Sequence, residues 1–236
     1  MKTIILAGGL GTRISEETEN KPKPMVLIDD KPLIWHVMNI YASQGYDDFV
    51  IAAGYKANVI NNWIENLESP WKIVSFDTGL DTMTGGRIKK CIESFPEERY
   101  FVTYGDGVGN VNLKLLLEFH MKNALLATVT AVRPPARFGV LDIEDGVVKH
   151  FGEKNQTDSG WINGGFFVIE NRVQDYIEGD NDLFETGPLP KLTVKNQLSA
   201  YQHNGFWKPM DTLREKRELQ DLARLTSPPW LNFLAT

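Results

Sequence analysis

Five short apolar segments stand out along the chain, each rich in β-branched or aromatic residues and apolar at nearly every position. They cover residues 3–7, 48–53, 100–104, 126–133 and 161–169. Strands that are apolar on both faces are typical of a sheet covered by helices on both sides. The pattern therefore predicts a central β-sheet built from these segments.

Three other segments repeat apolar residues with the period of an α-helix. They cover residues 32–45, 111–122 and 212–225. The first has Pro32 at its start and Gly45 just past its last apolar residue, which are the positions that these residues favour at helix ends. Because strands and helices alternate over the first half of the chain, we expect right-handed crossovers and a doubly wound, mostly parallel sheet.

The second half departs from this alternation. Residues 138–151 predict a hairpin that turns at Asp145 and Gly146, and the strand at 161–169 and two helical stretches follow. The polar residues 153–159 predict a surface loop near the ligand site. No linker rich in Pro, Gly or Ser separates the halves. We therefore expect one α/β domain over residues 1–236, with a mixed sheet and a small β/α elaboration in the C-terminal half.

Composition and charge exclude several classes of partner. The 236 residues include 25 Lys or Arg and 31 Asp or Glu, for a net charge of −6, without a basic cluster. Nucleic acids and anionic membranes are therefore not expected as partners, because both require clustered cations. The single cysteine, Cys91, excludes an internal disulfide. No apolar run approaches the roughly 20 residues that cross a bilayer, so we expect a cytoplasmic protein.

A glycine-rich loop follows the first predicted strand and contains Gly8, Gly9, Gly11 and Arg13. Glycines let backbone N–H groups approach a ligand, and an arginine adds a planar cation that suits phosphate oxygens. The spacing fits neither a P-loop nor a dinucleotide-binding motif. A tight connection after the strand would explain the glycines equally well, but Arg13 favours phosphate binding.

Two more charged residues lie in unusual local sequences. Lys23 stands between two prolines, which stiffen the backbone on both sides and favour a positioned cation over a solvated one. Asp106 stands between two glycines after the predicted strand at 100–104, at the end where a parallel sheet places ligand groups. One carboxylate there suits Mg²⁺, and an ordinary Asp-Gly turn explains the same residues equally well.

Together these residues resemble the sugar-1-phosphate nucleotidylyltransferase family. Strings similar to its cytidylyl-transferring branch follow one another nearly from end to end, at residues 6–18, 21–25, 83–87, 104–107, 137–139, 162–167 and 206–212. Uridylyl and thymidylyl relatives usually have a proline where this chain has Glu16, so this position favours the cytidylyl-transferring branch. The resemblance implies a Rossmann-like nucleotidyltransferase fold and Mg²⁺-dependent transfer from CTP to α-D-glucose 1-phosphate, which gives CDP-glucose and pyrophosphate.

The resemblance also implies roles for individual residues. The catalytic residues would be Lys23, Arg13 and Asp106. The nucleotide would contact Leu6, Ala7, Gly8, Gly9, Leu10, Gly11, Thr12, Arg13, Lys23, Thr82, Arg87 and Gly105. The sugar phosphate would contact Glu153, Lys154, Asn163 and Gly164. One Mg²⁺ would be held by Asp106 and Asp211, although the residues alone predict only a helix N-cap at Asp211.

Several alternatives stay open at this stage. The same transfer could use UTP or dTTP, or another sugar phosphate. Asn155 and Gly187 replace a proline and a glutamate that are usual in the family, and these departures bear on the choice of sugar rather than of nucleotide. A nucleotide-sensing module without activity would be expected to have lost Lys23, Asp106 or Asp211, and all three are present. A Rossmann oxidoreductase would need a carboxylate after the second strand, where the chain continues as Gly54 and Tyr55.

Subunit assembly is also open. Relatives in the resembling branch carry a longer insertion in the region that here lies between Trp63 and Thr78, and they use it in subunit contacts. A homo-oligomer is therefore compatible with the resemblance, but the short segment leaves its size undetermined.

Overall fold

A central β-sheet runs through the molecule, whose computed structural model describes residues 1–134, 139–144, 147–153 and 160–233. From one edge to the other, its strands are β5 (Lys72–Asp77), β4 (Asp48–Ala53), β1 (Lys2–Leu6), β6 (Arg99–Tyr104), β12 (Phe167–Glu170), β8 (Ala127–Val132) and β13 (Leu198–His203). Among these strands all neighbours pair in parallel except β12, which runs antiparallel to both β6 and β8. The short strand β11 (Ile162–Asn163) belongs to the same sheet and also pairs antiparallel with β8. This order confirms the expected mostly parallel, mixed sheet.

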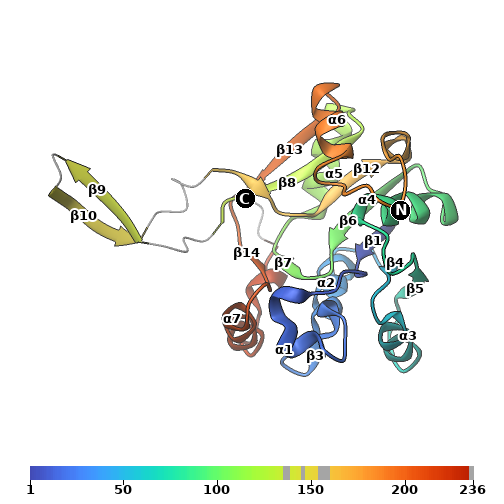
Figure 1. Cartoon of the computed structure of the whole chain (residues 1–236), viewed down its shortest axis with the longest axis horizontal. Helices are drawn as coiled ribbons and strands as arrows, with labels where there is room; N and C mark the ends of the chain where they lie inside the picture. Colours follow the sequence, from blue (N-terminus) through green and yellow to red (C-terminus); the bar gives the residue numbers. More distant parts are fainter. Residues whose placement is uncertain (135–138, 145–146, 154–159, 234–236) are drawn as a thin grey trace.

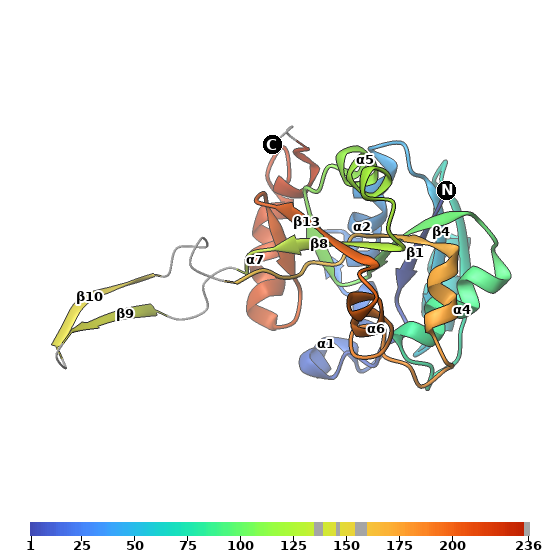
Figure 2. The same ribbon diagram turned by 90° about the horizontal axis from the view of Figure 1, so that it is seen from above.

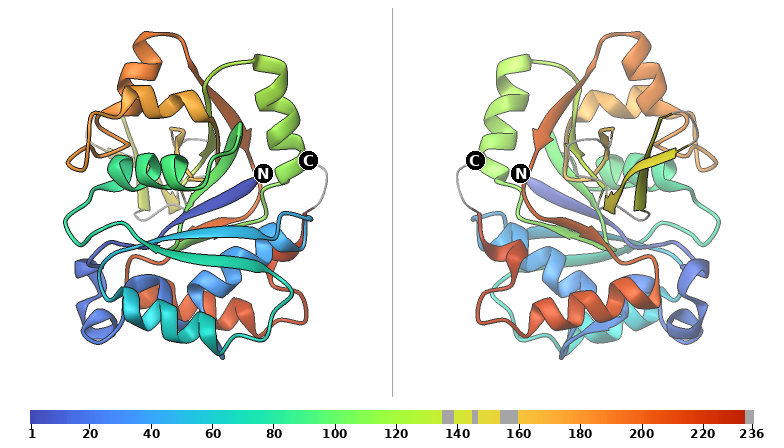
Figure 3. Two further views of the ribbon diagram at one scale, coloured as in Figure 1. Left: turned by 90° about the vertical axis from the view of Figure 1, so that its right-hand side faces the viewer. Right: turned by 90° about the vertical axis from the view of Figure 1, so that its left-hand side faces the viewer.

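Helices cover both faces of this sheet (Figure 3). One face packs against α2 (Leu33–Ala42), α3 (Ala57–Glu65), α5 (Leu113–Asn123) and α7 (Leu213–Ala223). The other face packs against α4 (Thr84–Ser94), the 3₁₀ helix η4 (Asn171–Tyr176) and α6 (Pro188–Val194). Alternate residues of β1 divide between two cores, since Ile5 joins the first core and Ile4 the second. The sheet is therefore doubly wound, as the continuously apolar strands predicted.

Strands at the sheet edges differ most from the prediction. Neither β5 nor β13 is apolar on both faces, and each alternates partly buried with exposed positions, because an edge strand needs less apolar surface. The predicted strand at 161–169 is broken into β11 (Ile162–Asn163) and β12. Between them Gly165 and Phe166 have φ values of 75° and 45°, in the left-handed region that interrupts a strand.

Short elements connect the main ones at the end of the sheet where β1 and β6 finish. They are the 3₁₀ helices η1 (Thr12–Ile14) and η2 (Lys23–Met25), α1 (Ser15–Thr18), the hairpin of β2 (Leu27–Ile28) and β3 (Lys31–Pro32), the ribbon of β7 (Gly107–Gly109) and β14 (Trp207–Pro209), and η5 (Pro229–Leu231) near the C-terminus. The β7–β14 ribbon pairs residues 98 to 102 positions apart and brings the start of α7 to the end of β6.

The predicted hairpin is present as β9 (Gly139–Glu144) and β10 (Val147–Glu153), which pair antiparallel. Figures 1 and 2 show this ribbon standing away from the sheet and its helices. The predicted turn at Asp145 and Gly146 lies outside the described residues, as do the surface-loop residues 154–159. In the part of the chain that the structure describes, no helix has the length and apolar character needed to span a membrane.

The core contains one buried hydroxyl whose removal is expected to be harmless. Thr3 on β1 is fully buried, and its Oγ1 has no hydrogen-bond partner among the described residues. Thr3→Val keeps the shape and removes the unpaired hydroxyl, so we expect the free energy of unfolding to stay constant or rise by about 1 kcal/mol. Urea-induced unfolding followed by circular dichroism measures this.

Thr128→Val is the matched control. Thr128 on β8 is equally buried, but its Oγ1 lies 2.8 Å from Nδ1 of His120 and 2.8 Å from Oγ of Ser199. Its loss leaves buried polar atoms unpaired and should lower the free energy of unfolding by about 1–3 kcal/mol. Equal losses for the two variants would contradict this account of the core.

Candidate functional site

A cavity of about 540 Å³ opens where β1 and β6 end, at the edge of the sheet expected for ligands. Its lining consists of residues 6–13, Lys23, Pro24, residues 80–84, Arg87, Tyr104, Asp106, Leu183 and Asp211. The structure thus brings together every predicted catalytic, nucleotide and metal residue except Gly105. That glycine lies just behind the lining, where its N–H donates to the carbonyl of Leu6 at 3.0 Å.

The three glycines of the first loop have three different surroundings, which give different physical reasons for a residue without a side chain. A Cβ on Gly8 would overlap the guanidinium of Arg87, so a side chain here would have to displace that guanidinium. Gly11 has φ of 65°, which glycine adopts most easily. A Cβ on Gly9 would meet nothing within 4 Å, and this residue is exposed. Of the three, Gly9 is therefore the position where an open approach to the backbone best explains the glycine.

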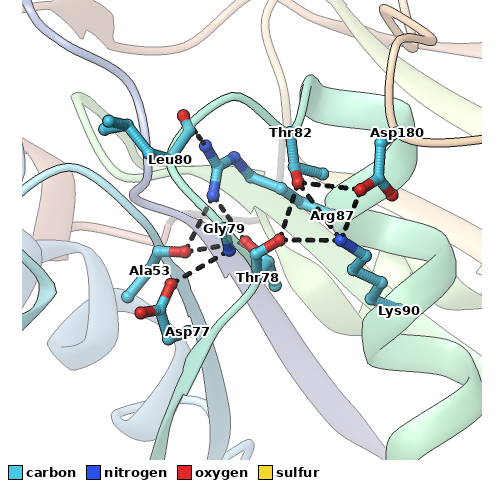
Figure 4. Close-up of polar contacts among 9 residues, drawn as sticks. All are labelled: Ala53, Asp77, Thr78, Gly79, Leu80, Thr82, Arg87, Lys90 and Asp180. Atoms are coloured by element: carbon cyan, nitrogen blue, oxygen red, sulfur yellow. Dashed lines mark hydrogen bonds and ion pairs between the residues drawn. The ribbon is translucent and has the colours of Figure 1, made fainter.

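The side chain of Arg87 on α4 is buried. Figure 4 shows its guanidinium directed toward Ala53, Thr78 and Leu80. One guanidinium nitrogen donates to the carbonyl of Ala53 at 2.8 Å and to Oγ1 of Thr78 at 2.5 Å. The other donates to the carbonyls of Gly8 at 3.1 Å and Leu80 at 3.2 Å. Burial lowers the pKa of Arg87, but an arginine remains charged at neutral pH. The guanidinium thus joins the first loop to the segments that follow β4 and β5.

A second group of contacts fixes residues 78–83, which precede α4 and contribute residues 80–83 to one wall of the cavity. The hydroxyl of Thr82 donates to the carbonyl of Thr78 at 2.7 Å, and Lys90 donates to that carbonyl at 2.9 Å and to Asp180 at 2.7 Å. The backbone N–H of Met83 donates to the carbonyl of Asp180 at 2.7 Å. The side chain of Thr82, predicted to contact the nucleotide, is therefore engaged within the protein. Sequence reasoning missed Lys90 and Asp180, because their contact spans 90 positions.

Four charged side chains, Arg13, Lys23, Asp106 and Asp211, form a charged cluster on the cavity lining. The ammonium of Lys23 lies 2.8 Å from Asp106 and 2.6 Å from Asp211. Arg13 lies 3.2 Å from the other oxygen of Asp211, and its own side chain is 76% exposed. The cluster combines two cations with two carboxylates, so both lysine and arginine can exchange a carboxylate for another anion.

The protonation states of this cluster follow from its contacts. Burial by itself would lower the pKa of Lys23, but the two carboxylates outweigh burial and the pKa is raised. Burial likewise disfavours the ionised form of Asp211, yet Lys23 and Arg13 hold its pKa below the ordinary value. At neutral pH Lys23 is therefore an ammonium and Asp211 a carboxylate.

Asp211 reaches the cluster through the β7–β14 ribbon. Pro209 pairs with Gly107, and the N–H of Met210 donates to the carbonyl of Asp106 at 2.8 Å. The prediction of a helix cap at Asp211 is wrong, because the N-cap of α7 is Thr212, whose side chain accepts from the N–H of Glu215. The Asp211 carboxylate instead faces Lys23.

The predicted sugar-phosphate residues Asn163 and Gly164 are not part of the cavity lining, but Asn163 contacts a residue that is. Asn163 on β11 donates from Nδ2 to the hydroxyl of Tyr104 at 3.0 Å, and Tyr104 is part of the lining. The carbonyl of Gly164 accepts from the indole of Trp207 at 2.8 Å. Glu153 is the last residue of β10, and Lys154 lies outside the described residues.

Three histidines and the single cysteine have contacts within the protein that are typical of structural rather than catalytic residues. The rings of His36 and His203 contact backbone carbonyls, and that of His120 contacts Thr128 and Glu170. Cys91 is buried, and burial raises the pKa of its thiol to about 12. Within the described ranges, no group of three His, Cys, Asp or Glu residues could hold a metal ion by itself. A metal at the cavity would therefore need ligand atoms beyond those of Asp106 and Asp211.

Comparison with known proteins gives consistent matches along the chain. The family model described as "Nucleotidyl transferase" matches residues 2–212. Glucose-1-phosphate cytidylyltransferase of Salmonella typhi is 44% identical over 98% of both chains. A probable glucose-1-phosphate cytidylyltransferase of Bacillus subtilis is 38% identical over 98% of this chain and 99% of that protein. The crystal structure of HddC from Yersinia pseudotuberculosis superimposes with a TM-score of 0.75 at 26% identity, covering 93% of this chain and 98% of that one.

The packing of Arg87 against the first loop makes a prediction about its glycines. Gly8→Ala forces the new methyl group against a guanidinium that four hydrogen bonds hold in place. We expect the free energy of unfolding to fall by about 1–3 kcal/mol, as for other overpacked sites. Thermal and urea unfolding measure the change.

Gly9→Ala is the matched control, because its methyl group meets no atom within 4 Å. Its free energy of unfolding should stay within about 0.5 kcal/mol of the parent. A Gly8→Ala protein as stable as Gly9→Ala would show that Arg87 moves aside freely, contrary to this description.

Proposed function

Because the chain belongs to the nucleotidyl transferase family, we propose that it is an enzyme that transfers the cytidylyl group of CTP to α-D-glucose 1-phosphate, with CDP-glucose and pyrophosphate as products. The observation that carries the proposal is the charged cluster on the cavity lining, next to the glycine-rich loop. The relatives named glucose-1-phosphate cytidylyltransferase support the choice of both substrates. The chain would act as a single nucleotidyltransferase domain.

The reaction needs charge neutralisation more than proton transfer. An oxygen of the sugar phosphate is already an anion, so it can attack the α-phosphorus of CTP without a general base. One P–O bond forms, the bond to the β-phosphate breaks, and pyrophosphate leaves with the electron pair. Lys23 and Arg13 would hold the phosphates and stabilise the charge that grows on them, while the backbone N–H groups of residues 8–13 would orient the triphosphate.

The carboxylates fit a divalent cation. Asp106 and Asp211 both turn an oxygen toward one ammonium, at 2.8 and 2.6 Å, so they are already gathered around a positive charge. Mg²⁺ binds one or two carboxylates and takes its remaining ligands from water and substrate phosphates. We propose that these two residues hold one Mg²⁺ together with the nucleotide. When bound, the ion would neutralise charge on the phosphates.

The two walls of the cavity would divide the substrates. Thr82 and Arg87 belong to the wall formed by the start of α4, and we propose that this wall shapes the nucleotide side. Asn163 contacts Tyr104, another residue of the lining. With Gly164, Glu153 and Lys154, it would contact the sugar phosphate.

The choice of substrates is tested by a matrix of nucleotides and sugar phosphates. Pyrophosphate release is measured with CTP, UTP, dTTP and GTP against several hexose 1-phosphates in the presence of Mg²⁺. We expect the highest kcat/KM for CTP with glucose 1-phosphate. A higher value for UTP or dTTP would overturn the assignment of the base, and tight binding of CTP without turnover would favour a nucleotide-sensing protein.

Lys23→Ala tests the charged cluster. The ammonium is held in place before the substrate arrives, so its loss should lower kcat by about 10²–10³. Lys21→Ala removes a lysine of the same proline-rich segment outside the cavity lining and should leave kcat within about twofold. Melting temperatures of both variants separate catalysis from folding. A Lys23→Ala enzyme with the turnover of the parent would exclude this role.

A further inference from the structure

A chain of three hydrogen bonds joins Thr84, at the start of α4, to Asn163, and Glu185 lies in the middle of it. Glu185 lies in the turn before α6. Its Oε2 accepts from the hydroxyl of Thr84 at 2.7 Å, and its Oε1 accepts from the hydroxyl of Tyr104 at 2.5 Å. The oxygen of Tyr104 in turn accepts from Nδ2 of Asn163 at 3.0 Å. Thr84 and Tyr104 line the cavity, whereas Glu185 does not.

The direction of every bond in this chain is determined. The N–H of Phe184 donates to Oγ1 of Thr84 at 2.9 Å, so the hydroxyl of Thr84 is left to donate its own proton to Glu185. A carboxylate can only accept. Burial, reinforced by the negative charge of Glu185, raises the pKa of Tyr104 far above its ordinary value, so the phenol keeps its proton. That proton is directed to Glu185.

Asn163 is oriented by this arrangement from two sides. Because the proton of Tyr104 is committed to Glu185, its oxygen can take an N–H from the amide. The amide oxygen of Asn163 accepts from the backbone N–H of Gly165 at 2.8 Å, which excludes the flipped amide. Among the described residues, the second N–H of this exposed amide has no partner, and it remains available to a ligand oxygen.

We propose that Glu185 is a positioning residue for the acceptor substrate. Acting through Tyr104, it fixes the amide of Asn163 so that an N–H group is presented to an oxygen of the sugar phosphate. This inference rests on the proposed function, in which Asn163 contacts that substrate. The residue acts without touching either substrate, because its two oxygens are occupied by Tyr104 and Thr84.

A carboxylate is needed at residue 185 because the hydroxyls of Thr84 and Tyr104 both donate a hydrogen bond to it. Glu185→Gln keeps the size but replaces one accepting oxygen with an NH₂ group, so one of the two bonds must break or reverse. If the bond to Tyr104 reverses, the phenol proton turns toward Asn163. The amide of Asn163 must then rotate against the N–H of Gly165 and loses its fixed orientation.

The experiment compares steady-state kinetics with each substrate varied in turn. Glu185→Gln should raise KM for glucose 1-phosphate by roughly tenfold, the loss expected for one oriented hydrogen bond, with KM for CTP and kcat changed by less than about twofold. Tyr104→Phe should have a similar effect. Because both residues act through one chain of bonds, the double variant should be no worse than either single variant.

Glu178→Gln is the matched control. Glu178 belongs to the same segment, but its carboxylate pairs with the exposed Lys191 at 2.6 Å, away from the cavity lining. Its kinetic constants should equal those of the parent. If Glu185→Gln does not fold, as judged by its melting curve, Tyr104→Phe and Asn163→Ala carry the same comparison, and their effects on KM should again not multiply.

The outcomes separate this inference from the proposed function. A parent chain that neither turns over nor binds glucose 1-phosphate in a calorimetric titration overturns the proposed function, and this inference with it. With an active parent, only the inference is overturned if Glu185→Gln behaves like Glu178→Gln. The same holds if KM rises equally for both substrates, or if the effects of Glu185→Gln and Tyr104→Phe multiply.

Discussion

The ammonium of Lys23, held between Asp106 and Asp211, is the interaction on which the site depends. Two carboxylates at close range repel each other and would repel a triphosphate even more strongly, unless a cation stands between them. Lys23 supplies that cation from a stiff segment far away in the sequence. The contact therefore fixes where the η2 segment, the end of β6 and the start of α7 meet, and it gives the cavity its charged lining.

Two buried cations near the cavity differ in their partners: Lys23 pairs with carboxylates, and Arg87 with neutral oxygens. Lys23 is balanced by carboxylates and can release them when a phosphate or a metal ion arrives. Arg87 is bound by three backbone carbonyls and one hydroxyl, so its full charge remains behind the glycine-rich loop. Such a fixed charge raises the positive potential of the cavity without offering a competing anion. The first loop is thus preorganised by packing and by charge at once.

The sequence predicted the central strands well, because burial on both faces leaves a clear local pattern of apolar residues. Segments such as β4 are apolar at nearly every position because both faces of the strand are covered, and its predicted limits agree with those observed. Edge strands such as β5 are not apolar at every position, so the pattern used to find the other strands did not reveal them. The break between β11 and β12 also escaped, because the backbone conformation at Phe166 follows from packing rather than from its residue type.

For the site, the sequence by itself determined the candidates: a glycine-rich loop, a stiffened lysine and a carboxylate at a strand end are short local patterns, and the structure places all three on one cavity lining. Only the tertiary structure decided the partners. Asp211 meets Lys23 across 188 positions, and Tyr104 meets Glu185 across 81. Gly8 lies against the guanidinium of Arg87, 79 positions away in the sequence. Such contacts are made by strand pairing and helix packing between distant segments, and no local pattern in the chain records them.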